Sequence, residues 1–337
     1  MKTTRREFIE KTLLISSGLA LGATSAAGSA ISSSDEFKSS SGNKTNGKGF
    51  RFSVFSKCLQ WLNYEEMADF VAGLGFDGIE LTVRPNGHVL PENVETDLPK
   101  AFSAAKKAGI SIFMIVTSIN DANDQLTEKI LKTASSLGIE HYRMDWLYYD
   151  DKKPVDENLK LILQKLQKLE TLNRKFKIHG EYQNHSGKYS PNSYFGSAIW
   201  DLYQVLSKID SPWMGSQYDI MHATVEGAYA WETGLKRIYP YIHSLAFKDF
   251  IWQKNQDKWA TECVNIGEGM VNMDYYLDLI KNLKIECPVS VHYEYPMGGI
   301  EKGEKILKGM DKKEVMQKMK NDLETLKRNF KEKGLIP

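Results

Sequence analysis

The sequence has few of the features that assign a chain to a common class at first sight. Among its 337 residues there are only three cysteines, Cys58, Cys263 and Cys287, an odd number at wide spacing. They predict neither a disulfide framework nor a zinc ligand set. We interpret them as small buried hydrophobic residues.

An excess of charge of one sign is also missing. The 44 Lys and Arg residues are balanced by 43 Asp and Glu, which gives a formal net charge of +1. This balance gives no electrostatic reason to expect nucleic acid or an anionic membrane surface as a partner. With 42% hydrophobic and 26% charged residues, the chain can bury one large core and bind a small polar ligand.

The N-terminal segment lacks an apolar run long enough to cross a bilayer. Residues 13–23 are apolar but too few to span it; Arg5-Arg6 precedes them, and small residues ending at Ala30 follow. This is the order of a cleaved export signal, and the arginine pair before Phe8 and Ile9 resembles a twin-arginine signal. An ordinary Sec signal or an N-terminal membrane anchor is the alternative. No cysteine follows the stretch, which argues against a lipid anchor.

The predicted domain organisation follows from this segment. We expect residues 1–30 to be the export signal, residues 31–48, which are almost all polar or small, to be a disordered linker, and residues 49–337 to be one folded domain. The mature protein would then be exported, periplasmic or extracytoplasmic, without a stable membrane anchor. Its oligomeric state is not predicted.

Strand-like and helix-like segments alternate from Phe52 onward. We expect strands at 52–57, 77–83, 110–117, 140–145, 176–183, 214–219, 242–248 and 288–294. We expect helices at 64–74, 98–108, 122–136, 155–173, 195–209, 227–238, 272–284 and 311–333. Eight of each over about 285 residues is the usual size of a closed (β/α)8 barrel. A doubly wound open sheet is the alternative, although the turn after the first strand lacks the glycines of a nucleotide-binding fold.

Four apolar runs in the second half of the chain end on polar side chains. Because the C-terminal ends of barrel strands share one mouth, these side chains should line one pocket. The run-ends are Glu181-Tyr182-Gln183-Asn184-His185, Tyr218-Asp219-Ile220-Met221-His222, Ala246-Phe247-Lys248-Asp249 and His292-Tyr293-Glu294-Tyr295-Pro296.

The order of the motifs resembles the xylose isomerase-like TIM barrels, the sugar isomerases and epimerases that also include endonuclease IV. The matching pieces are Phe76-Asp77-Gly78-Ile79-Glu80, Asn184-His185, Asp219-x-x-His222, Lys248-Asp249 and Glu294. A narrower resemblance is to an exported branch named as sugar phosphate isomerases or epimerases. Its matching pieces are Arg84-Pro85-Asn86-Gly87-His88-Val89-Leu90-Pro91-Glu92, Gln217-Tyr218-Asp219 with His222-Ala223-Thr224-Val225-Glu226-Gly227, and His292-Tyr293-Glu294-Tyr295-Pro296.

The resemblance implies a divalent metal site that this chain keeps only in part. The epimerases of the family hold one ion with Glu, Asp, His and Glu from strands five to eight, a ligand set that suits Mn²⁺, Mg²⁺ or Co²⁺. Asp219 and Glu294 match, but Gln183 and Ala246 replace the first Glu and the His. Either Gln183, Asp219 and Glu294 bind an ion weakly, or the site is metal-free and Lys248 supplies the positive charge.

A shifted alignment is a further possibility for the metal site. Glu181 lies on the same strand face as Gln183, so a shift of two residues would restore a carboxylate ligand.

The resemblance to the family also implies roles for individual residues. The catalytic candidates are Lys248 or Glu294 as the base and His222 or His185 as the acid. The candidates for substrate binding are Glu80, Arg84, His88, Arg143, Trp146, Gln183 and His292. Glu80 with Arg84, and Arg143 with Asp145, are either ligand clamps or internal salt bridges, while Trp61, Trp146 and Trp252 follow strand ends and could stack on a sugar ring.

Histidines early in the expected strands carry other expectations. We expect His179 and His243 to be core residues and His141 to be exposed at the start of its strand.

Together these features predict an exported carbohydrate-active barrel that transfers a proton next to a sugar carbonyl, as an isomerase or epimerase. A 3-keto-glycoside lyase that works by β-elimination is the first alternative, because it shares the same first step. A non-catalytic glycan-binding barrel is the second. The predicted location makes a phosphorylated sugar an unexpected substrate, so the expected partner is a small sugar or glycoside.

Overall fold

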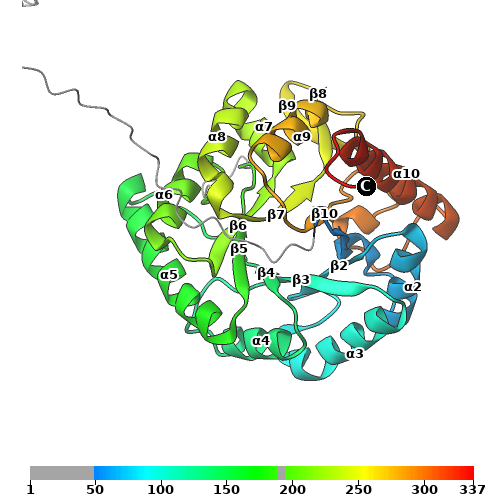
Figure 1. Ribbon diagram of the computed structural model, residues 1–337, viewed down its shortest axis with the longest axis horizontal. Helices are drawn as coiled ribbons and strands as arrows, with labels where there is room; N and C mark the ends of the chain where they lie inside the picture. The colour runs from blue at the N-terminus through cyan, green and yellow to red at the C-terminus, as the bar shows by residue number, and fades with distance from the viewer. Residues whose placement is uncertain (1–48, 188–193) are drawn as a thin grey trace, which may run out of the picture. The chain divides into compact units, whose positions relative to one another are not determined.

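Eight parallel strands close into a barrel in the order β1-β10-β7-β6-β5-β4-β3-β2 (Figure 1). The computed structural model describes residues 49–187 and 194–337, so the predicted signal and linker lie outside the described residues. The closure confirms the (β/α)8 barrel and excludes the open sheet. The barrel strands are β1 (Phe52–Phe55), β2 (Gly78–Val83), β3 (Ser111–Thr117), β4 (His141–Arg143), β5 (His179–Gln183), β6 (Met214–Asp219), β7 (Ile242–Phe247) and β10 (Val289–Val291).

Helices surround the barrel and bury their apolar stripes against it (Figure 1). In α5, for example, Leu159, Ile162, Leu166 and Leu169 are all buried. None of the helices in the described part of the chain is long and apolar enough to cross a membrane. The α-helices are α2 (Tyr64–Leu74), α3 (Val94–Lys107), α4 (Gln125–Ser136), α5 (Val155–Phe176), α6 (Ile199–Ile209), α7 (Ile220–Gly227), α8 (Trp231–Ile238), α9 (Met273–Asn282) and α10 (Lys312–Glu332).

Several strands end earlier than the sequence pattern predicts. The first, fourth and eighth barrel strands have only four, three and three residues. Lys57, Lys248 and Glu294 therefore follow the last paired residue of their strands instead of lying within the sheet. In the sixth unit, by contrast, α7 begins directly after Asp219, a helix that the sequence pattern did not predict.

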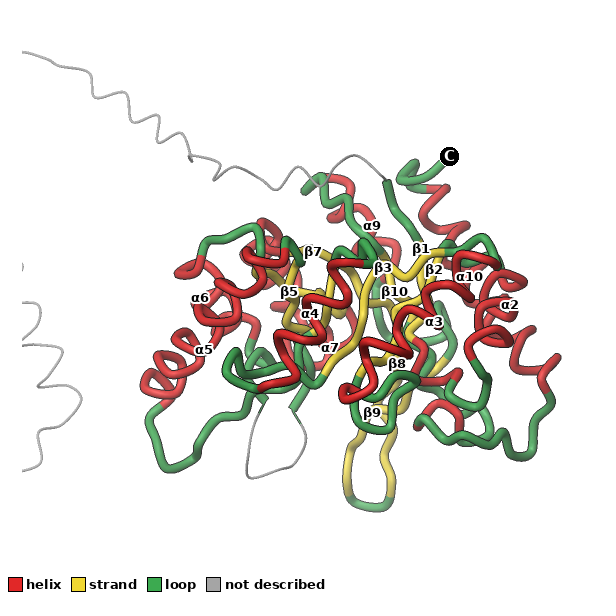
Figure 2. The backbone as a smooth tube through the Cα atoms, turned by 90° about the horizontal axis from the view of Figure 1, so that it is seen from below, coloured by secondary structure: helices red, strands yellow, loops and turns green. Residues whose placement is uncertain are grey.

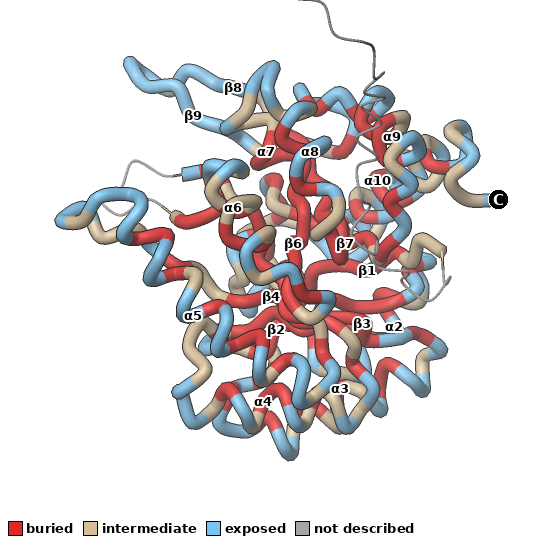
Figure 3. The backbone as a smooth tube through the Cα atoms, turned by 60° about the vertical axis from the view of Figure 1, so that its left-hand side comes forward, coloured by how far each residue is buried: buried red, intermediate tan, exposed pale blue. Residues whose placement is uncertain are grey.

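A hairpin after the seventh barrel strand is the largest feature that the sequence analysis missed. The strands β8 (Asp249–Asn255) and β9 (Lys258–Val264) pair antiparallel along their full length. The hairpin extends away from the barrel (Figure 2), and most of it is exposed (Figure 3). Two runs of strand-forming residues around the short turn at Gln256 carried the signal, but the barrel pattern on either side hid it.

Asp249 fixes the base of this hairpin. Its fully buried carboxylate accepts hydrogen bonds from the backbone N–H groups of Phe250 at 2.9 Å, Gly267 at 3.1 Å, Gly269 at 3.0 Å and Val271 at 3.1 Å. A Cβ atom at Gly269 would lie 2.1 Å from the Asp249 Oδ1 atom, so only glycine allows this approach. The side chain thus joins the first residues of the hairpin to the segment that follows it.

We expect Asp249→Ala to lower the free energy of unfolding by about 3 kcal/mol or more, because four backbone N–H groups, two of them fully buried, lose their acceptor. Urea unfolding measures this change. The control is Asp257→Ala at the exposed hairpin turn, which should change stability by less than about 0.5 kcal/mol. Equal stability of the two variants would show that Asp249 does not anchor the hairpin.

Candidate active site

The polar strand ends meet in one cavity of about 680 Å³ at the C-terminal mouth of the barrel. Gln183, Lys248 and Glu294 line it, and the fully buried Asp219 lies against Lys248. Among the other lining residues are Lys57, Arg84, Arg143, Trp146, His185, His222 and His292. The strand ends of the second half of the chain therefore form one site.

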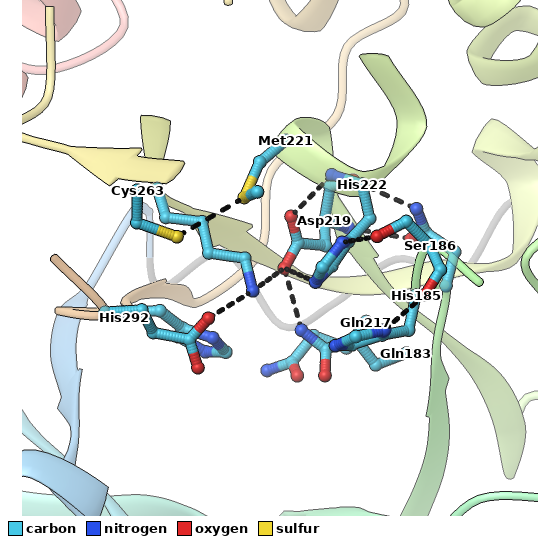
Figure 4. Close-up of polar contacts among 12 residues, drawn as sticks. Gln183, His185, Ser186, Gln217, Asp219, Met221, His222, Cys263 and His292 are labelled. Carbon is cyan, nitrogen blue, oxygen red and sulfur yellow. Dashed lines mark hydrogen bonds and ion pairs between the residues drawn. The ribbon is translucent and has the colours of Figure 1, made fainter. Parts of the chain in front are cut away.

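Asp219 is held at the junction of β6 and α7. Its Oδ1 atom accepts a hydrogen bond from the His222 N–H at 3.1 Å, which caps the helix, and Oδ2 accepts one from Gln183 Nε2 at 2.8 Å (Figure 4). Asn184 holds the Asp219 backbone, because its side chain accepts from the Asp219 N–H at 2.8 Å and donates to the Asp219 carbonyl at 2.9 Å. The carboxylate thus has a fixed position beside a helix N-terminus, where negative charge is favourable.

Lys248 lies between the two carboxylates of the site. Its Nζ atom is 3.3 Å from Asp219 Oδ2 and 2.9 Å from Glu294 Oε2, and only 3% of its side chain is exposed. Burial alone would lower the pKa of Lys248, but Asp219 and Glu294 raise it above its usual value. The side chain is therefore an ammonium group without a lone pair, and the structure does not support the predicted role of Lys248 as the base.

Glu294 contacts a second ammonium group, which the sequence analysis missed. Lys57 donates to Glu294 Oε1 at 2.7 Å. Burial would raise the pKa of Glu294, but Lys248 and Lys57 hold it well below its usual range. The carboxylate is therefore ionised, and 23% of its side chain is exposed. Lys57 also follows a strand end, so the rule that found the other residues could have found it.

The donor set does not fit a divalent ion as it is arranged. Arg143 Nη1 donates to Gln183 Oε1 at 2.9 Å, and an arginine can only donate, so the amide oxygen of Gln183 faces Arg143 and not Asp219. Asp219 Oδ2 and both Glu294 oxygens already face N–H donors. Over residues 49–187 and 194–337, no three His, Cys, Asp or Glu side chains are grouped as metal ligands would be.

Glu181 does not restore the missing ligand. It is fully buried, accepts a hydrogen bond from Ser244 and lies 2.5 Å from His141 Nδ1. The prediction that His141 is exposed was wrong, because this contact buries it. Glu181 and His141 lie two residues before Gln183 and Arg143 on their strands. Gln183 and Arg143 line the cavity, whereas Glu181 and His141 do not, so the shifted alignment does not bring Glu181 to the site.

Two of the predicted substrate-binding residues are internal instead. Glu80 is fully buried and accepts hydrogen bonds from Gln217 at 3.1 Å and from Ser290, with His292 Nε2 at 3.1 Å. His88 contacts Thr82, Ser56 and the Leu59 carbonyl, and it is not among the cavity-lining residues. The alternation of side chains along a strand predicted which ones point into the barrel, but not how far each lies from the cavity at its mouth.

The predicted clamps and tryptophans have mixed outcomes. Arg84 and Arg143 line the cavity, with their guanidinium groups 5.6 Å and 4.7 Å from the centre of the Phe55 ring. Trp146 also lines it and packs edge-on against His185. Trp61 instead packs on the hydrophobic core.

His185 and His222 form a pair of neutral imidazoles with ring centres 3.7 Å apart (Figure 4). His185 Nδ1 donates to the Ser186 carbonyl at 2.8 Å, so its Nε2 atom carries a lone pair. Burial, with the charge of Lys248, lowers the pKa of His185 to about 3 and that of His222 well below its usual value. The predicted role as an acid therefore requires that these rings first accept a proton.

His222 also has an unsatisfied nitrogen. Its Nδ1 atom is 2.8 Å from Ser186 Oγ, while the buried Nε2 atom has no hydrogen-bond partner among the described residues and lies 3.8 Å from Asp219 Oδ2. A buried polar atom without a partner carries a cost that a bound ligand can remove.

A family model described as xylose isomerase-like TIM barrel matches residues 68–319. The chain belongs to this family. A comparison with curated proteins finds no match. The family covers proteins of several activities, so membership settles the fold and not the reaction.

Solved structures with the same fold include three of known or probable activity. One is the probable 3-DHS dehydratase AsbF from Bacillus anthracis, with 14% identity, 82% of this chain and 98% of that chain covered, and a TM-score of 0.61. The second is the 3-keto-D-glucoside 4-epimerase YcjR from E. coli, with 12% identity, 83% of this chain and 99% of that chain covered, and a TM-score of 0.60. The third is D-psicose 3-epimerase from Clostridium cellulolyticum H10, with 11% identity, 82% of this chain and 98% of that chain covered, and a TM-score of 0.60. At these identities the likeness shows the fold alone.

We expect Lys248→Met to cost about 3 kcal/mol of unfolding free energy at pH 7, because Asp219 and Glu294 lose the ammonium group between them. The lowered pKa of Glu294 stabilises the wild type above its unfolded-state value of about 4.5, and this stabilisation is lost as the pH falls through the folded-state value. The stability difference should therefore shrink below about pH 5. Urea unfolding at several pH values measures it.

The matched control is Lys57→Met, which leaves Lys248 between the two carboxylates. Its cost at pH 7 should be smaller than that of Lys248→Met. A difference between wild type and Lys248→Met that is the same at pH 7 and at pH 4 would refute the charge arrangement.

Metal removal gives an independent check of the donor set. Dialysis against a chelator should leave the melting temperature unchanged, and excess Mn²⁺ should not raise it, because a ligand stabilises only a protein that it binds. A rise in melting temperature with Mn²⁺ that Asp219→Asn abolishes would show that the site rearranges to hold the ion.

Proposed function

We propose that this protein transfers a proton at the carbon next to a sugar carbonyl, as a sugar isomerase or epimerase. One observation carries the proposal: Glu294 is an ionised carboxylate, partly open to the cavity, with an ammonium group on each oxygen. A carboxylate can take a carbon-bound proton. The two ammonium groups lower the pKa of Glu294 and so weaken it as a base, but they also stabilise the negative charge that then develops on the substrate.

In the proposed reaction, Glu294 takes the proton from the carbon next to the carbonyl. The electron pair of the broken C–H bond forms a carbon–carbon double bond, and the carbonyl oxygen becomes an enediolate oxygen. Lys248 and Arg143 stabilise that charge, since both are cations that line the cavity. Return of the proton by Glu294 to the neighbouring carbon gives isomerisation, whereas delivery of a proton by a second group to the opposite face of the same carbon, with Glu294 keeping the first proton, gives epimerisation.

The imidazole pair fits the hydroxyl chemistry of such a reaction. During isomerisation the hydroxyl next to the carbonyl must lose its proton, and His185 Nε2 can accept it and return it later. The unsatisfied Nε2 atom of His222 would gain a partner from a second substrate hydroxyl. In this scheme both histidines begin neutral, in agreement with their lowered pKa values.

A second reaction, β-elimination of a keto-glycoside, starts from the same enediolate. The group on the next carbon then leaves with its bonding electrons and takes up a proton. The size of the cavity, about 680 Å³, favours this alternative, since it leaves room for a leaving group beside one sugar ring. Among the structures of the same fold, the probable 3-DHS dehydratase is named for an elimination, and the 3-keto-D-glucoside epimerase for a keto-glycoside.

We also propose that the protein works outside the cytoplasm, from the order of residues 1–30. Its substrate would then be a free sugar or glycoside and not a sugar phosphate.

We expect solvent deuterium to appear at carbon when the protein is incubated in D₂O with D-fructose or with a 3-keto-glucoside, without preference for fructose 6-phosphate. Glu294→Gln keeps the shape and removes the charge, and it should slow the exchange about 10²-fold or more. Proton NMR measures the loss of the carbon-bound hydrogen.

Glu304→Gln is the control, because Glu304 pairs with Lys308 outside the cavity and its variant should exchange like the wild type. If no keto sugar exchanges, while the protein binds glycans and Glu294→Gln leaves that binding intact, the protein is a glycan-binding barrel and not an enzyme.

A further inference from the structure

The base of the β8–β9 hairpin forms part of the cavity wall. Thr261, Glu262 and Cys263 of β9 line the cavity. Cys263 Sγ lies 4.0 Å from the sulfur of Met221, another lining residue (Figure 4). A ligand that fills the cavity therefore reaches the foot of the hairpin.

One face of the hairpin continues this wall outward. Opposite residues of an antiparallel pair lie on the same face, and so do residues two apart along a strand. The register pairs Phe250 with Cys263, Trp252 with Thr261, and Lys254 with Trp259. Trp252 and Trp259 therefore share the face that carries two cavity-lining residues, Cys263 and Thr261.

The two tryptophans expose large ring surfaces on that face. Trp252 is 42% exposed and Trp259 is 58% exposed. In the described part of the chain, the Trp252 ring contacts one other ring, that of Phe250, with the ring centres 6.3 Å apart. The Trp259 ring contacts no other ring and no cationic side chain there. Two residues along a strand are about 7 Å apart, so the pair lies within reach of a ligand that leaves the cavity.

We propose that this face of the hairpin binds the second sugar ring of a glycoside whose first ring occupies the cavity. The inference rests on the proposed function for the first ring and extends it to the substrate class. An indole ring offers a flat apolar surface to the C–H face of a sugar, while Thr261 and Lys254 offer hydrogen bonds to hydroxyl groups at its edge.

Continuity with the cavity decides in favour of this occupant. A surface that binds another protein need not begin at the wall of a cavity, whereas an extended substrate that leaves the cavity past the lining residue Thr261 next meets this face of the hairpin. The face carries one cation, Lys254, and no carboxylate, so it fits an uncharged glycan better than a cationic one.

Calorimetry on the full mature chain tests the proposal with cellobiose, maltose, lactose and sucrose, each compared with its constituent monosaccharides. We expect at least one disaccharide to bind about tenfold more tightly than its monosaccharides. Trp252→Ala and Trp259→Ala should each remove most of that advantage and leave monosaccharide binding unchanged. The comparison measures binding, so a failure of the proposed reaction would not alter it.

Two controls separate the subsite from other effects. Trp200→Ala removes a tryptophan of similar exposure, 43%, on α6, and Gln253→Ala changes the opposite face of the hairpin. Both should keep the disaccharide advantage. The proposal would be overturned if no disaccharide in the panel bound more tightly than its monosaccharides, or if the tryptophan variants also lost monosaccharide binding. It would also be overturned if the wild type were a dimer and the tryptophan variants monomers, because the face would then be an interface between copies. Loss of deuterium exchange in Glu294→Gln with the advantage retained would separate the subsite from the reaction.

Discussion

The site depends on one buried charge arrangement, in which the Lys248 ammonium lies between Asp219 and Glu294. Two carboxylates at the ends of the two barrel strands that flank β7 repel each other and cannot both stay ionised away from water without a cation. Lys248, directly after β7, supplies that cation, and Lys57, two residues after β1, supplies another to Glu294. Gln183 is then held between Asp219 and Arg143, so these two neighbours fix the orientation of its side-chain amide.

This arrangement explains how a member of the family can keep two carboxylates where its ligand set is incomplete. Ala246 offers no donor atom, and the amide oxygen of Gln183 is turned toward Arg143. Side chains supply positive charge beside both carboxylates, since Lys248 contacts Asp219 and Glu294, and Lys57 contacts Glu294. The negative charges of Asp219 and Glu294 are thus balanced by lysine side chains of the chain itself.

The barrel could be predicted from the sequence because its signals are periodic and local. Alternating strands and helices predicted a barrel, with an open sheet as the alternative, and the structure shows the closure; polar strand ends predicted the cavity, with Gln183, Lys248 and Glu294 on its wall. No periodic or local pattern in the sequence shows how far an inward-pointing side chain lies from the cavity. Glu80 and Glu181 have the same inward alternation as Gln183, yet hydrogen bonds inside the barrel satisfy them.

The parts that were missed depend on contacts between distant segments. His88 was a substrate-binding candidate from the stretch 84–92 on which the family resemblance rests, but Thr82 and the Leu59 carbonyl hold its ring. The β8–β9 hairpin was missed because it is inserted between the seventh barrel strand and the helix α9 that follows. The order of barrel strands and helices is the same with or without it.

The hairpin also bears on which reaction the site performs. A cavity that closes around one ring keeps water and side reactions away from the enediolate of a free monosaccharide. Here one wall of the cavity continues into an exposed strand pair with two tryptophans, and Glu294 keeps part of its surface open. Such a mouth suits a substrate with a second ring that itself covers the opening. On a keto-glycoside the same enediolate can either be reprotonated or expel the second ring, and the position of that ring on the hairpin would decide between epimerisation and elimination.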